Sequence, residues 1–146
     1  MLRRTDRAYL AGLVDGEGSI GIDNHGGLRS PSVRITITNT NFLILEGLQE
    51  LWGGHLAARR QRKSSWKPVS DLIWAARPET DRILKAIKPY LKGKREQCRT
   101  ALLFNKTVNK KYAGVGNGVP LPIQVQRQEL RKQMLELNKR GQPLTG

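Results

Sequence analysis

The first regular pattern of apolar positions along the chain predicts a short amphipathic helix. Leu10, Leu13 and Val14 recur at the spacing of one helix face. Thr5 or Asp6 precedes them and is suited to cap the helix. The first 16 or so residues are therefore expected to be helical, with one face in a core.

Small residues occupy another face of this predicted helix. Ala8, Gly12 and Gly16 recur every four residues, and a glycine inside a helix costs about 1 kcal/mol relative to alanine. Such a stripe is typical of a helix that a second helix approaches closely. We expect Ala8, Ala11, Gly12, Asp15 and Gly16 to form this contact.

Two stretches of alternating polarity follow and predict a hairpin. In "GSIGIDN" (18–24) and "SVRITITN" (32–39), every second residue is a β-branched apolar one. A sheet with one buried and one polar face fits this pattern. The residues expected on the polar face are Ser19, Gly21, Asp23, Ser32, Arg34, Thr36 and Thr38.

Further helices and a second hairpin are predicted from residue 42 onward. A helix over 42–52, capped by Asn39 or Asn41, ends at Gly53-Gly54. A hairpin over 55–76, a helix over 78–91 and a basic helix over 92–112 follow, then a Gly- and Pro-rich linker and a helix over 123–140. The order α-β-β-α-β-β-α, followed by further helices, predicts an α+β fold whose antiparallel sheet carries helices on one face. We expect one domain over 1–112, with the linker and helix of 113–146 packed on it.

The charge of the chain points to a polyanionic partner. There are 26 Lys and Arg against 12 Asp and Glu, a net charge of +14, which favours nucleic acid. The basic residues are spread over strands rather than along one amphipathic helix, which argues against a membrane surface. Cys98 is the only cysteine, so no intrachain disulfide forms and a reducing, intracellular compartment is expected. Together with His25 and His55 it gives no credible zinc site.

The polar face of the first hairpin and the second hairpin, over 55–76, which is rich in Lys and Arg, are candidate contacts to the DNA major groove. This groove is wide enough for a two-stranded ribbon. Arg34 and Arg59 suit guanine, and Gln61 suits adenine. A solvated sheet face is the alternative. Trp52 and Trp74 are expected in the core, whereas Trp66 is free to stack on a base. The further candidate contacts are Arg29, His55, Lys63, Trp66, Lys67, Asp71, Ile73 and Lys92.

Glu17 is an unusual residue in this setting, because a carboxylate facing a phosphate backbone is repelled unless a divalent cation lies between them. Mg²⁺ accepts oxygen ligands of this kind. Asp15 is either a second ligand or a structural cap, and its position on the helix favours the cap.

The nine residues from Leu10 to Gly18, LAGLVDGEG, closely resemble the signature motif of the LAGLIDADG homing endonucleases. Val replaces Ile, Gly replaces Ala, and Glu replaces the last Asp. The resemblance extends over roughly 5–112 through the order of the elements. It implies a site-specific endonuclease that cuts both strands of a long DNA target. A single motif resembles the members that act as homodimers on pseudo-palindromic DNA.

The resemblance also implies roles for individual residues. Glu17 is the metal ligand, assisted by the Gly16 carbonyl, and Asn39 holds metal-bound water. Lys94, with Lys92 as the competing residue, lies near the scissile phosphate. The implied cofactor is Mg²⁺, with Mn²⁺ or Ca²⁺ supporting binding in its place. A DNA-binding protein without activity and an RNA-binding intron maturase of the same fold remain as alternatives.

Overall fold

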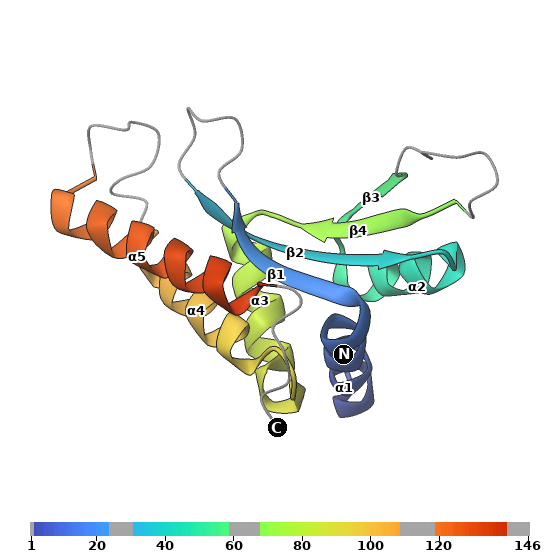
Figure 1. The fold of residues 1–146 in the computed structure, drawn as a ribbon. Helices are drawn as coiled ribbons and strands as arrows, with labels where there is room; N and C mark the ends of the chain where they lie inside the picture. Colours follow the sequence, from blue (N-terminus) through green and yellow to red (C-terminus); the bar gives the residue numbers. More distant parts are fainter. Residues whose placement is uncertain (1, 24–30, 59–67, 109–118, 140–146) are drawn as a thin grey trace, which may run out of the picture.

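The computed structural model describes residues 2–23, 31–58, 68–108 and 119–139. Figure 1 shows a sheet with helices beneath it. In chain order the elements are α1 (Arg4–Glu17), β1 (Gly18–Asp23), β2 (Ser32–Asn39), α2 (Phe42–Trp52), β3 (His55–Ala58), β4 (Ser70–Trp74), α3 (Arg77–Ile87), the 3-10 turn η1 (Lys88–Tyr90), α4 (Arg95–Lys106) and α5 (Leu121–Leu137).

The described strands form one antiparallel sheet in the order β1-β2-β4-β3. Ile35 lies opposite Ile20 on one side and Trp74 on the other, and Ile37 lies opposite Leu72. All of these side chains are buried on the face that the helices cover. The predicted α+β fold, with helices on one face of an antiparallel sheet, is therefore confirmed.

Side chains from the helices complete a single core against this face. Leu10 and Val14 of α1, Ile83 and Leu84 of α3, and Phe104 of α4 have no exposed surface. Trp52 and Trp74 are also buried, as expected. Trp74 donates its indole N–H to the Trp52 carbonyl, 3.2 Å away, which joins the end of α2 to β4.

The junction between α1 and β1 is sterically closed. A Cβ at Gly18 would lie 2.8 Å from the Val14 Cα, 2.9 Å from the Val14 carbonyl oxygen and 3.1 Å from the Thr36 carbonyl oxygen. Backbone atoms cannot yield as a flexible side chain can. The chain therefore turns from helix to strand directly under β2, and the end of α1 is fixed relative to the sheet.

The start of α1 differs from the predicted cap, whereas both ends of α2 agree with the prediction. Arg3, not Thr5 or Asp6, precedes the first turn of α1, and the Asp6 carboxylate accepts the Arg3 backbone N–H at 3.0 Å. For α2, Asn41 is the cap, accepting from the Leu43 N–H at 3.2 Å. Gly53 and Gly54 then adopt positive φ and end the helix, as the sequence predicts.

The segment around 88–94 is the main correction to the predicted helices. α3 ends at Ile87, because Pro89 has no N–H and the chain continues as the turn η1. The next helix begins at Arg95 rather than at position 92. The backbone N–H groups of Lys92 and Lys94 donate to the Asp15 carboxylate instead of beginning a helix.

The last helix, α5, runs beside α4 and touches β1. The Arg127 guanidinium is buried and donates to the Thr107 hydroxyl at 3.0 Å and to its carbonyl at 2.7 Å. At the other end, the Asn138 amide donates to the Ile20 carbonyl at 2.8 Å. Among the described helices, none is long and apolar enough to span a membrane.

Candidate functional site

One face of the sheet gathers the described strand residues that the sequence predicts for DNA contact. Lys92, which is also predicted, lies in the loop before α4. Residues directly opposite each other on paired strands share a face. One row across the four strands is therefore Ser19, Thr36, Ile73 and His55. Neighbouring rows on that face place Gly21 opposite Arg34, Asp23 opposite Ser32, and Thr38 opposite Asp71. The predicted contacts Arg29, Arg59, Gln61, Lys63, Trp66 and Lys67 lie outside the described residues.

Polar side chains on this face already have interactions with one another. The Thr38 hydroxyl donates to the Asp71 carboxylate at 2.5 Å, and the Arg34 guanidinium lies 3.7 Å from the Asp23 carboxylate. Both members of the latter pair are more than a third exposed, so the pair adds little to stability. The pair shows that the Arg34 and Asp23 side chains lie next to each other across β1 and β2.

Glu17 and Asn39, predicted separately as site residues, are in direct contact. Glu17 is the last residue of α1 and Asn39 the last of β2. The Asn39 amide nitrogen donates to the exposed Glu17 carboxylate at 2.5 Å, and its amide oxygen accepts the Asn41 N–H at 2.8 Å. The second bond fixes which end of the amide faces Glu17. The fold thus presents a carboxylate, oriented by an amide, at the point where α1 ends, β1 begins and β2 ends.

Lys94 is held at the same end of α1. Its ammonium group donates to the Asp15 backbone carbonyl at 2.8 Å. The Asp15 carboxylate in turn accepts the Lys92 N–H at 2.7 Å and the Lys94 N–H at 2.9 Å. The Lys92 side chain is exposed. Of the two competing lysines, Lys94 is therefore the one anchored beside the helix end that carries Glu17.

The environment of Asp15 changes its acidity. Partial burial alone would raise the pKa of its carboxyl group. Backbone N–H groups of Lys92, Gly93 and Lys94, together with the charge of Lys94, outweigh this effect, and the pKa lies below the ordinary value of 3.8. Asp15 thus has a structural role within its own chain, in line with the interpretation that the sequence favours. The loop over 92–94 had no sequence signal for this contact, which joins positions 77 and 79 apart.

The stripe of small residues on α1 faces solvent. Ala8, Gly12 and Gly16 are exposed, and a Cβ built on either glycine meets no atom within 4 Å. Ala11 is a correction to the predicted contact set, because its side chain has no exposed surface and packs in the core. Asp15 also departs from the predicted contact set, since its carboxylate binds the 92–94 loop.

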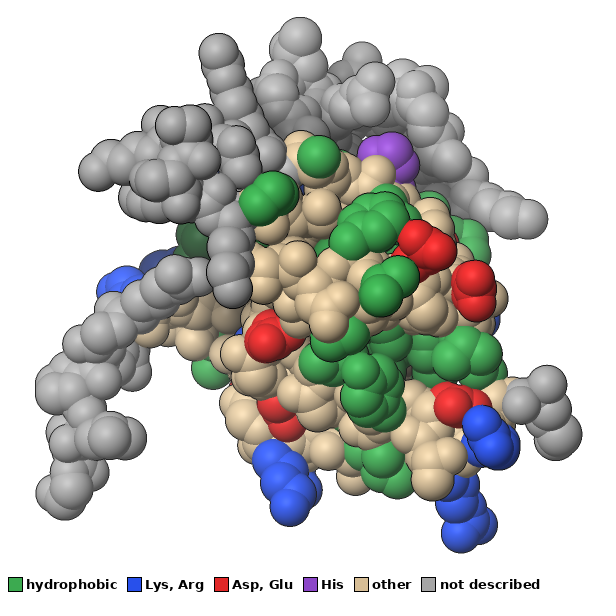
Figure 2. All heavy atoms as spheres, turned by 90° about the vertical axis from the view of Figure 1, so that its right-hand side faces the viewer, with side chains coloured by type: hydrophobic (Ala, Val, Ile, Leu, Met, Phe, Trp, Pro, Cys, Tyr) green, Lys and Arg blue, Asp and Glu red, His purple; other side chains and the backbone are tan. Residues whose placement is uncertain are grey.

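Exposed apolar side chains accumulate on the side of the molecule where α2 lies. Figure 2 views this side and shows a band of hydrophobic side chains across it. On α2, Phe42, Leu43 and Leu51 are 48%, 76% and 50% exposed, and on α1 Tyr9 is 54% exposed. Apolar surface gathered in this way is typical of contact with another macromolecule.

The end of α1 offers oxygen ligands that suit a divalent ion such as Mg²⁺, but one chain supplies only a few of the ligands that such an ion needs. Glu17 is exposed, and the space around Gly16 is open. Carboxylate and carbonyl oxygens are the ligands that Mg²⁺ takes, along with water and phosphate oxygens. In the described part of the chain, no three His, Cys, Asp or Glu side chains form a metal-binding group. Residues 16 and 17 fit an ion whose other ligands come from outside this chain.

A family model described as a LAGLIDADG-like domain matches residues 4–87, more than half of the chain. The chain belongs to the LAGLIDADG family. The matched segment includes α1 with the motif, the four described strands and α3. No curated protein matches the chain.

Solved structures of LAGLIDADG proteins share the fold at low sequence identity. The homing endonuclease I-CvuI in complex with its target, in the presence of Ca, is 22% identical with a TM-score of 0.73, over 96% of this chain and 85% of that one. The archaeal intron-encoded homing endonuclease I-Vdi141I complexed with DNA is 16% identical with a TM-score of 0.71, over 94% and 87%. For I-GzeII in complex with its DNA target the values are 16% and 0.68, and the match covers 95% of this chain but only 47% of that one.

Proposed function

We propose that this LAGLIDADG protein is a site-specific endonuclease that cuts both strands of a DNA target. The observation that carries the proposal is the position of Glu17. An exposed acid stands at the end of α1, where β1 begins, and is oriented by Asn39 at the end of β2. The Lys94 ammonium is bound to the Asp15 carbonyl two residues before it. A carboxylate in this position can face a phosphate backbone when a divalent cation lies between them.

DNA binding is proposed through the polar face of the sheet. A β-ribbon fits the major groove, where base edges differ from pair to pair. The row that crosses all four strands gives hydroxyl and imidazole groups, and Arg34 gives a guanidinium. Relatives of the same fold are complexed with DNA, which supports this assignment. Lys and Arg around the face supply the salt-dependent part of the affinity.

A homodimer is proposed through the exposed stripe of α1. Ala8, Gly12 and Gly16 leave room for a second backbone, and the same stripe on a twin helix is complementary to it under two-fold symmetry. The relative I-GzeII, of which this chain covers less than half, is long enough to hold two such units in one chain. A symmetric dimer brings two copies of Glu17 to the shared axis and implies a target that is nearly an inverted repeat.

Mg²⁺ is the proposed cofactor, held by the Glu17 carboxylate and the Gly16 carbonyl. Relatives crystallised with Ca or Mg support divalent-metal use. When bound, such an ion stabilises charge on phosphoryl oxygens and lowers the pKa of bound water. The protein's own part is positional. Asn39 orients the Glu17 carboxylate, and Lys94, tied to the Asp15 carbonyl, keeps a positive charge beside the helix end.

The test is a cleavage selection followed by a charge-removing substitution. A duplex library of randomised inverted repeats is incubated with the protein and Mg²⁺, and cut ends are captured and sequenced. On the selected target, Glu17→Gln keeps an oxygen that can accept the Asn39 bond but removes the charge. We expect the variant to bind DNA with similar affinity. Its cleavage rate should be at most about one thousandth of the wild-type rate, which corresponds to an activation barrier several kcal/mol higher.

Glu129→Gln, which removes an equally exposed acid from α5, is the matched control and should cut at the normal rate. Cleavage by Glu17→Gln at the wild-type rate would contradict the mechanism. A wild-type protein that selects and binds a target without cutting it would instead be a DNA-binding member of the family without activity.

A further inference from the structure

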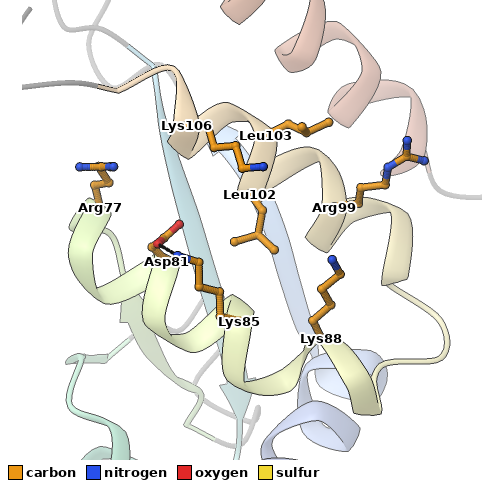
Figure 3. Close-up of a pocket in the computed structure, with 8 residues that line it drawn as sticks. All are labelled: Arg77, Asp81, Lys85, Lys88, Arg99, Leu102, Leu103 and Lys106. Carbon is orange, nitrogen blue, oxygen red and sulfur yellow. Dashed lines mark ion pairs between the residues drawn. The ribbon is translucent and has the colours of Figure 1, made fainter.

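A second basic surface lies in the helical layer, in a groove of about 470 Å³ between α3 and α4. Figure 3 shows its two walls, one from α3 and η1 and one from α4, with Leu102 between the two rows of charged side chains. Five cationic side chains and a single acid line it. The lining residues are Arg77, Asp81, Lys85 and Lys88 on one wall, and Arg99, Leu102, Leu103 and Lys106 on the other.

The spacing of these residues shows that the two helices direct complete faces into the groove. On α3 and η1 they follow one another by four, four and three positions, and on α4 by three, one and three. Both spacings describe one face of a helix. The cationic side chains of α3 and η1 thus face those of α4 across the groove, and these like charges repel one another. An anion in the groove removes this repulsion.

Few acids in the described structure neutralise these cations. Lys85 pairs with Asp81 at 2.7 Å, and Arg99 lies 3.7 Å from Glu96. The Arg77 Nε donates to the Asn105 carbonyl, which leaves its charge in place. Lys88 and Lys106 have no acidic partner within 4 Å among the described residues.

The groove is separate from the polar face of the sheet. α3 and α4 pack against β2 from the side opposite to that face, so a duplex lying on the sheet does not enter the groove. The groove therefore carries its own binding capacity, and an inference from it does not depend on the proposed cleavage.

The chemistry of the lining selects the kind of ligand. All five cations are hydrogen-bond donors, which match phosphate oxygens, and the lining contains no aromatic ring on which a base could stack. The volume is within the range of small-ligand sites, about 300–1,000 Å³, which admits linked sugars and phosphates but no duplex. We propose that this groove binds the phosphodiester backbone of a single nucleic-acid strand without reading its bases.

The experiment measures binding of fluorescein-labelled 12-mers of uridylate and of thymidylate to the full chain by anisotropy. The variant is Lys88→Gln with Lys106→Gln, and the matched control is Lys132→Gln with Lys139→Gln, which removes the same charge from exposed positions of α5 and its end. Each phosphate contact contributes about 0.7 to the slope of log K against log salt for single strands. Losing two contacts should lower the slope by about 1.4 and the affinity by about 25-fold at 0.1 M salt.

Three further readouts decide the result. Lys88→Arg with Lys106→Arg should bind as the wild type, since a phosphate accepts either cation.

The two oligonucleotides should bind within about threefold of each other, and a larger preference would contradict recognition of the backbone alone. Photo-cross-links from 4-thiouridine should map to α3 and α4. An equal loss in the two Gln variants, or cross-links confined to the sheet, would overturn the proposal. Cleavage of duplex DNA is measured separately and should be the same in all of these variants.

Discussion

At the scale of single residues, the Asp15 carboxylate joins parts of the chain that are 79 positions apart. It accepts backbone N–H groups from the loop before α4, while the Lys94 ammonium binds the carbonyl of the same residue. These contacts of Asp15 with the 92–94 loop fix the end of α1 on one side, and the close packing of Gly18 against Val14 and Thr36 fixes it on the other. Both sets of contacts therefore determine the position of Glu17, which lies between Asp15 and Gly18.

Asp15→Asn is expected to reduce stability in a pH-dependent way. Because the folded pKa of Asp15 is lowered below the ordinary value of 3.8, ionised Asp15 stabilises the fold above that value. This stabilisation is lost as the pH falls through the folded pKa. Near pH 7 the variant should be about 1.5 kcal/mol less stable, the lower end of the contribution of one hydrogen bond to a charged group. Urea unfolding at several pH values measures it. A difference that is unchanged between pH 7 and pH 3 would show that the charge of Asp15 has no such role.

At the scale of elements, α1 carries three different surfaces. Leu10, Ala11 and Val14 face the core, the exposed stripe of small residues faces outward, and the last turn presents Glu17 beside Asn39. The helix therefore combines packing, proposed dimer contact and the candidate cleavage site within 14 residues. A change on one of these surfaces should leave the others intact.

Gly12→Leu tests that separation. The added side chain meets nothing within the chain, and leucine favours helix over glycine by close to 1 kcal/mol, so the protomer should fold normally. It should nevertheless elute as a monomer, since the bulk prevents close approach of a twin helix. Sizing chromatography with light scattering and circular dichroism measure both. Gln128→Leu on the exposed side of α5 is the control and should dimerise as the wild type does. A dimeric Gly12→Leu protein would contradict the proposed interface.

The sequence predicts well the elements whose apolar residues recur at the spacing of the face that is buried in the core. Alternation in β2 gives its buried and polar faces residue by residue, and apolar spacing places α1 and α2. The sequence fails where long-range contacts decide. The start of α4 is set by Asp15 rather than by local preference, and Ala11 is drawn into the core although it stands beside the small-residue stripe. The contact of Glu17 with Asn39 follows from the register of β1 on β2, which no local pattern contains.

At the scale of the whole molecule, each protomer of the proposed dimer supplies one Glu17. A mixed dimer of wild type and Glu17→Gln should therefore cut only one strand. Fusing the two versions in one chain through a flexible linker fixes the composition. On a supercoiled plasmid carrying the selected target, we expect the nicked circle to accumulate, whereas a fusion of two wild-type copies gives the linear form. Linear product from the mixed fusion at the wild-type rate would contradict one acid per strand.

The glycines of the motif are subject to different constraints, and this difference has an evolutionary consequence. A side chain at Gly18 collides with the chain's own backbone, while one at Gly12 or Gly16 meets nothing within it. Selection for a folded protein alone retains Gly18, whereas Gly12 and Gly16 are retained only while a second copy must approach. In a lineage that had lost its target and no longer needed to pair, substitutions would accumulate first at positions 12 and 16. Position 18 would change only in chains that had ceased to fold.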